Sequence, residues 1–169
     1  MFNYLFVVLI VVTIFIYFYS KKYSIKIRNQ SGYLHSLPQY YGFYASLWFL
    51  IPSLIIIGLY LIFAESFVTS TLIKSLPNDI KNLPVNELNL VVNDIKNLAV
   101  GNIANSSSFT GINEAANFYN EQYELIDKVV FYSSLIMGLL TFTYAYKTIS
   151  SSYRARNFIE SAIHILLFG

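Results

Sequence analysis

The chain has 169 residues, of which 56% are hydrophobic, 18% aromatic and only 12% charged, and its mean hydropathy is +0.52. A water-soluble domain of this size needs more polar surface than such a composition supplies, so this class is excluded. The absence of cysteine excludes disulfides and thiolate metal sites. The formal net charge of +2 is informative only when it is resolved along the chain.

Three apolar stretches reach membrane-spanning length, namely Phe2 to Tyr19, Phe43 to Phe63 and Val129 to Tyr146. As helices they would be roughly 27, 31 and 27 Å long, close to the thickness of the hydrocarbon core of a bilayer. None contains Asp, Glu, Lys, Arg or His, so no proton relay or ion path is indicated. The sequence predicts an all-α integral membrane protein with three transmembrane helices.

The positive charges lie on one side of these spans. Four cations separate the first two spans and three follow the third, whereas residues 65–128 hold four lysines against eight acids. The seven cations are Lys21, Lys22, Lys26, Arg28, Lys147, Arg154 and Arg156. Because Lys and Arg near span ends stay in the cytoplasm, we expect the N-terminus outside and the C-terminal end inside. This rule explains the basic loop without a nucleic-acid partner.

The first span is not expected to be a cleaved leader. No cation precedes it, no small-residue cleavage site follows it, and Lys21 and Lys22 lie at its far end. The expected organisation is therefore two membrane helices joined by a short basic cytoplasmic loop (1–64), an extracytoplasmic helical segment (65–128), a third membrane helix (129–152) and the start of a further helix (153–169).

Two features inside the spans concern packing. Pro52 removes a helical hydrogen bond and frees the carbonyl of Trp48, so a bend is expected there; Ser53 or a neighbouring helix could satisfy that carbonyl. Ser134 and Gly138 lie four residues apart, which places two small residues on one helix face where another backbone could approach.

The outer segment has helical patterning. Residues 78–83 and 93–98 both read Asn-Asp-Ile-Lys-Asn-Leu, which indicates either a duplicated packing surface or a coincidence in an Asn-rich sequence. We expect helices starting near Asn78 and near Pro84, then a flexible connector over residues 101–111. From Asn113 a helix is expected to run unbroken into the third span.

The sequence contains no motif typical of a catalytic or cofactor-binding site. His35 and His164 are the only histidines and have no carboxylate-rich metal spacing around them. No Gly-rich phosphate loop and no nucleophile motif is found. We therefore expect no enzymatic activity, no metal and no cofactor.

Two segments carry a family resemblance. Residues 34–44 read Leu-His-Ser-Leu-Pro-Gln-Tyr-Tyr-Gly-Phe-Tyr, with Trp48 shortly after them, and residues 153–160 read Tyr-Arg-Ala-Arg-Asn-Phe-Ile-Glu. In this order, and flanked by these spans, they resemble the N-terminal region of the C-type permease subunit of bacterial phosphate-uptake ABC transporters. Gln39 departs from the small residue that the family pattern has there.

The resemblance implies a location in the bacterial inner membrane and several partners besides the lipid bilayer: the remaining permease core, a second permease subunit, a cytoplasmic ATPase and a periplasmic phosphate-binding protein. It also implies that residues 158–168 open a first core helix that is cut off by truncation or a split reading frame; otherwise they form an interfacial helix. The candidate interaction residues are Tyr40, Tyr41, Gly42, Trp48, Arg154, Arg156 and Glu160.

We accordingly expect a segment that assembles or regulates a phosphate importer. Two alternatives fit the same layout. A transmembrane sensor input module also has two helices that bracket an outer domain, although its chain normally continues into a cytoplasmic signalling helix. A small stand-alone membrane scaffold would keep every structural expectation and lose only the link to phosphate.

Overall fold

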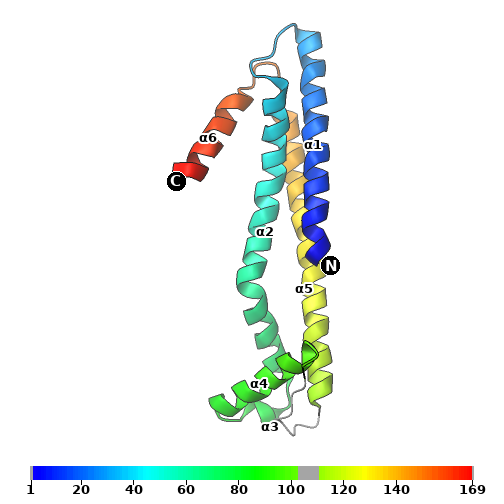
Figure 1. Ribbon diagram of the computed structural model, residues 1–169, viewed down its shortest axis with the longest axis vertical. Coiled ribbons are helices and arrows are strands. Elements are labelled where there is room, and N and C mark those ends of the chain that lie inside the picture. Colours follow the sequence, from blue (N-terminus) through cyan, green and yellow to red (C-terminus); the bar gives the residue numbers. More distant parts are fainter. Residues whose placement is uncertain (1, 103–110, 169) are drawn as a thin grey trace. The chain divides into compact units, whose positions relative to one another are not determined.

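The computed structural model describes residues 2–102 and 111–168, and these residues contain helices and no strand (Figure 1). The helices are α1 (Phe2–Ser31), α2 (Pro38–Ser75), α3 (Asn78–Lys81), α4 (Val85–Ala99), α5 (Ile112–Thr148) and α6 (Ala155–Phe168). Helices α1, α2 and α5 are long and apolar enough to cross a membrane. The predicted all-α membrane protein is therefore confirmed. Most of the expected connector, residues 103–110, lies outside the described residues.

The three long helices extend beyond the apolar stretches that predicted them. Helix α1 continues to Ser31, so the expected basic loop is wrong in part: its four cations lie on the last turns of a helix. No Gly or Pro interrupts the chain before Gly32, which adopts a φ of +77° and donates its N–H to the carbonyl of Arg28 at 2.9 Å. Helix α2 likewise continues to Ser75, just before Pro77.

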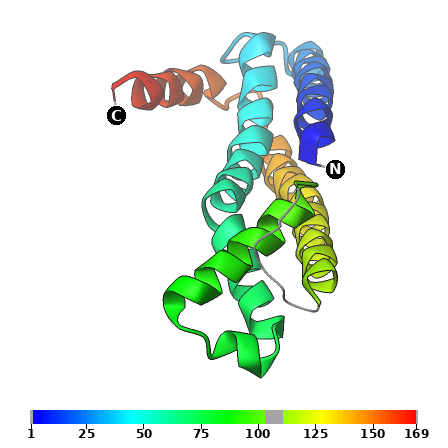
Figure 2. The same cartoon turned by 60° about the horizontal axis from the view of Figure 1, so that its bottom comes forward.

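The chain divides into two compact units, which are described separately. Unit 1 comprises residues up to 57 and from 131 onward, and unit 2 comprises residues 58–130. In unit 1, α1, the first part of α2 and the last part of α5 lie side by side, and α6 diverges from them (Figures 1 and 2).

Close contacts join the three long helices of unit 1. A Cβ atom added to Gly42 of α2 would lie within 3.0 Å of the ring and the carbonyl oxygen of Tyr17, so only glycine permits this crossing of α1 and α2. The rings of Tyr23 and Tyr146 pack α1 against α5 with a centroid distance of 4.5 Å. Both contacts lie near the end of α1 that carries the cations.

Unit 2 has its own hydrophobic core, formed by one face of α4 against α2, α3 and α5. Val68, Leu72 and Ile95 are buried at its centre. The isoleucine and leucine of both Asn-Asp-Ile-Lys-Asn-Leu copies pack into this core; they are Ile80 and Leu83, and Ile95 and Leu98. The duplicated hexapeptide therefore presents the same two apolar side chains to one core, although the first copy forms only a single turn, α3.

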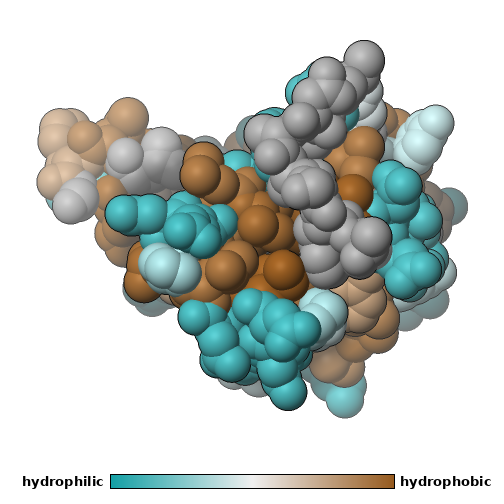
Figure 3. Space-filling view, turned by 90° about the horizontal axis from the view of Figure 1, so that it is seen from below, coloured by the Kyte–Doolittle hydropathy of each residue, from teal (hydrophilic) through white to brown (hydrophobic). Residues whose placement is uncertain are grey.

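The surface of unit 2 around α3 and α4 carries both hydrophobic and hydrophilic side chains. Figure 3 shows hydrophobic groups between clusters of hydrophilic ones. In α4 and just after it, Val85, Leu90 and Val100 are exposed.

Helix α5 runs unbroken from Ile112 to Thr148, as the sequence predicts.

Candidate functional site

Two segments that are far apart in the sequence meet in unit 1, namely residues 34–48 and residues 150–160. We call their contact the motif junction, because it contains both stretches that resemble the permease family. The fully buried Tyr41 lies at its centre and donates its hydroxyl to the carbonyl oxygen of Tyr153 at 2.7 Å. A buried polar group without a partner costs about 1–3 kcal/mol, so this bond strongly favours the observed pairing.

The same junction caps the N-terminus of α6. The backbone N–H of Arg156, in the first turn of α6, donates to the hydroxyl oxygen of Ser36 at 3.2 Å. The first N–H groups of a helix lack partners within the helix, and serine is a preferred side chain to satisfy them. The N–H of His35 donates to the carbonyl of Ser151 at 2.9 Å, which fixes Ser36 in place. A residue from the loop before α2 thus acts as the cap for a helix 120 residues further along.

Aromatic rings also join the two segments of the motif junction. The ring of Tyr44 lies 4.9 Å from the rings of both Tyr153 and Phe158. The ring of Trp48 contacts Tyr144 at 5.5 Å and stacks on Phe158 at 6.2 Å. Each such pair contributes about 0.5–1.5 kcal/mol beyond area burial, so α6 is held by packing as well as by its cap.

The expected small-residue face of α5 contacts α2. A Cβ atom added to Gly138 would lie closer than 3.0 Å to the side chains of Ser53 and Phe49. Ser134 is fully buried, and its carbonyl accepts a hydrogen bond from the hydroxyl of Ser53 at 2.9 Å. This is the close backbone approach that the spacing of the two small residues predicts.

The bend at Pro52 stays a prediction, but α5 supplies a donor to the carbonyl that Pro52 leaves free. The hydroxyl of Thr141 lies 2.5 Å from the carbonyl oxygen of Trp48, the acceptor that Pro52 leaves free. Ser53 donates instead to Phe49 in its own helix and to α5. Of the two partners considered from the sequence, the neighbouring helix therefore satisfies the Trp48 carbonyl.

The structure brings only part of the candidate set together. Tyr40, Tyr41 and Trp48 belong to the apolar cluster of the motif junction. Gly42 faces α1 instead, where it permits close helix contact. The remaining candidates, the charged residues Arg154, Arg156 and Glu160, are exposed.

The charges of α6 pair along the helix surface. The guanidinium Nε of Arg156 lies 2.6 Å from Oε1 of Glu160, one turn further on. The hydrogen bond and the charge of Glu160 raise the pKa of Arg156 above its ordinary value. Arg154 and this pair are accessible to a partner, whereas the tyrosines hold the junction together.

Sequence reasoning missed three residues that build the junction. Ser36, Tyr153 and Phe158 all lie within the two segments that resemble the permease family. Nothing in the spacing of these residues indicates that the two segments contact each other.

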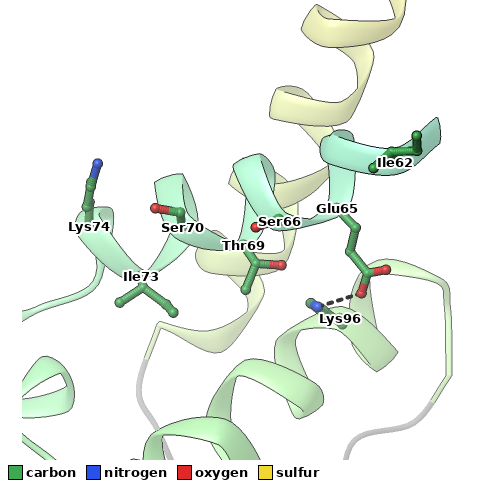
Figure 4. Close-up of a pocket in the computed structure, with 8 residues that line it drawn as sticks. All are labelled: Ile62, Glu65, Ser66, Thr69, Ser70, Ile73, Lys74 and Lys96. Atoms are coloured by element: carbon green, nitrogen blue, oxygen red, sulfur yellow. Dashed lines mark hydrogen bonds and ion pairs between the residues drawn. The ribbon is translucent and has the colours of Figure 1, made fainter. Parts of the chain in front are cut away.

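A second concave surface lies on unit 2. Figure 4 shows this groove, which has a volume of about 600 Å³ and contains the ion pair between Lys96 and Glu65, 2.9 Å apart. Lys74 points away from that pair. Because the charged groups do not converge on one point, the groove is not assigned to a ligand. Within residues 2–102 and 111–168, no three metal-ligating side chains come together.

The helices and the junction define an α-helical integral membrane protein whose short last helix is fixed by its N-terminal end. A family model described as phosphate ATP-binding cassette transporter matches residues 5–168. The chain therefore belongs to the phosphate ATP-binding cassette transporter family, as the two motifs predict. Neither the curated proteins nor the solved structures contain a match.

Proposed function

We propose that the chain is the N-terminal membrane segment of the permease subunit of an ABC-type phosphate importer, where it contributes to the assembly or regulation of ATP-driven inorganic phosphate uptake. The observation that carries the proposal is the motif junction. The first of the two stretches that resemble the permease family caps and packs the start of the second, which forms the first turns of α6.

The exposed surface of α6 supports an assembly role. Beyond the junction, Ile163, Ile165 and Leu167 are more than half exposed, which gives α6 apolar surface for other membrane helices or lipid. Arg154 and the Arg156–Glu160 pair lie at its start. In the proposed role, these groups contact the permease core and the second permease subunit, and the chain itself performs no chemical step.

The charge distribution supports an orientation in the bacterial inner membrane with the N-terminus outside. The motif junction then lies on the cytoplasmic side, where the ATPase binds, and residues 65–128 lie outside, on the side of the periplasmic phosphate-binding protein. The segment boundaries 1–64, 65–128, 129–152 and 153–169 belong to the same proposal.

Charge reversal at the start of α6 tests the proposal. Arg154→Glu combined with Arg156→Glu is expected to reduce co-purification of the second permease subunit and the ATPase with the affinity-tagged chain, or to invert the last span in a reporter-fusion assay. Lys74→Glu with Lys81→Glu reverses the same number of charges in unit 2 and should change neither. Unchanged assembly and topology in the arginine variant would count against the proposal and favour a stand-alone scaffold.

A further inference from the structure

A groove of about 680 Å³ in unit 1 combines positive charge with aromatic side chains. It is formed by the last turns of α1 and one side chain of α5. Its principal lining residues are Tyr19, Lys22, Tyr23, Lys26, Asn29 and Tyr146. Two of these residues, Tyr23 and Tyr146, also pack against the apolar cluster of the motif junction, whereas Lys22 and Lys26 play no part in the function proposed above.

Lys22 and Lys26 are one helical turn apart, so both ammonium groups reach the same side of α1. Among the ion pairs of the described residues, none includes either lysine. The positive-inside rule accounts for cations in this region, but it does not place two of them in one groove. The adjacent Lys21 lies outside the groove, over the ring of Tyr17 at 6.0 Å.

The tyrosines form the wall of the groove. The ring of Tyr146 lies 4.5 Å from that of Tyr23 and 5.6 Å from that of Tyr19, so α1 and α5 hold the three rings together. The amide of Asn29 adds a donor at the polar end. Ammonium and amide donors above an aromatic wall suit an anionic group attached to an apolar body.

The position of the groove relative to the membrane surface indicates which anion it binds. The apolar stretch of α1 ends at Tyr19, and the two lysines follow at roughly 5 and 10 Å further along the helix axis. The headgroup layer extends roughly 5 to 8 Å beyond the hydrocarbon on each side, so Lys22 lies within it. The long side chain of Lys26 tilts back toward the N-terminus of α1 and can reach the same layer. Basic pockets at this level between transmembrane helices bind anionic lipid headgroups.

We propose that this groove binds a phosphate group, with Lys22 and Lys26 as its charge partners. Its position favours the headgroup of an anionic phospholipid as the source of that group. A free phosphate solute shares the same chemistry and is tested in parallel.

The test uses the full chain in nanodiscs of phosphatidylcholine alone or mixed with phosphatidylglycerol, and in detergent with inorganic phosphate. Native mass spectrometry of protein released from the nanodiscs counts retained phosphatidylglycerol, and titration in detergent measures its apparent affinity. Lys22→Gln with Lys26→Gln is expected to weaken phosphatidylglycerol binding by about tenfold or more, since each cation near a membrane surface contributes about 1 kcal/mol.

Lys21→Gln with Arg28→Gln is the matched control, because it removes the same charge from the same helix outside the groove; it should leave binding nearly unchanged. Phosphatidylglycerol binding that inorganic phosphate does not displace identifies the headgroup as the ligand. Displacement by inorganic phosphate that depends on Lys22 and Lys26 identifies a solute site. Equal weakening by both variant pairs, or retention of phosphatidylcholine and phosphatidylglycerol in equal measure without phosphate binding, would overturn the proposal.

Discussion

At the residue scale, glycine has two different roles in these helices. At Gly42 and Gly138 a side chain would collide with a neighbouring helix, whereas at Gly58 a Cβ atom would meet nothing within 4 Å. None of the three has a positive φ, so the difference arises from packing alone.

This contrast gives a matched mutation series. Gly42→Ala and Gly138→Ala should each destabilise the protein by about 1–3 kcal/mol, because the added methyl group overpacks a helix crossing. Gly58→Ala should be neutral or stabilising by about 0.5–1 kcal/mol, since alanine is the better helix former. Unfolding of the purified variants in detergent measures these differences. Equal effects at all three positions would show that helix propensity, not close packing, governs them.

The hydrogen bonds of the motif junction can be removed with little change in shape. Tyr41→Phe should cost about 1–3 kcal/mol, because the carbonyl of Tyr153 loses its buried partner. Ser36→Ala should cost about 1 kcal/mol by removing the cap of α6. Thermal unfolding in detergent gives both values, and the fluorescence of Trp48, the only tryptophan, reports whether α6 leaves the junction. If both variants unfold at the same temperature as wild type, these hydrogen bonds do not stabilise the motif junction.

The junction should also respond to alkaline pH. Burial raises the pKa of the Tyr153 hydroxyl above its ordinary value of 10.0. A group with a raised folded-state pKa stabilises the fold below its unfolded pKa, and this contribution is lost as the pH rises through the folded value. Between about pH 8 and about pH 11, the unfolding midpoint of wild type should therefore fall more than that of Tyr153→Phe. Parallel curves for the two proteins would contradict this expectation.

At the scale of elements, the central part of each membrane helix could be predicted from the sequence and its ends could not. Hydropathy marks only the part that matches hydrocarbon, whereas the helix continues until Gly32 or Pro77 stops it. The two segments of the motif junction could also be identified from the sequence. That they contact each other depends on interactions such as the hydrogen bond from Tyr41 to a backbone carbonyl 112 residues away. No local pattern encodes such a contact.

The part of α2 around Pro52 depends on α5 for a hydrogen-bond donor. Pro52 leaves the carbonyl of Trp48 without its helical donor, and Thr141 of α5 supplies one. Thr141→Val should destabilise the pair of helices by about 1–3 kcal/mol. Thr143→Val is the control, because the Thr143 hydroxyl donates within its own helix, to Leu140. A Thr143 variant as unstable as the Thr141 variant would argue against a specific role for the Thr141 hydroxyl in satisfying the Trp48 carbonyl.

At the scale of the whole molecule, the family membership and the motif junction lead to the same account. The match to the phosphate ATP-binding cassette transporter family spans residues 5–168, and the junction joins segments from both ends of that range. In the proposed function, a membrane segment with no chemistry of its own presents α6 to the remainder of an importer. The junction then matters for transport because it fixes the start of that helix.

The most direct test of this account is the uptake of radiolabelled inorganic phosphate by cells in which the native gene is deleted and then complemented. The account predicts that deletion lowers uptake, that the wild-type gene restores it, and that Ser36→Ala combined with Tyr41→Phe restores it only in part. Ser70→Ala with Tyr132→Phe, which changes the same residue types at exposed positions, should restore it fully. Uptake at the wild-type rate in cells that lack the chain would contradict the account.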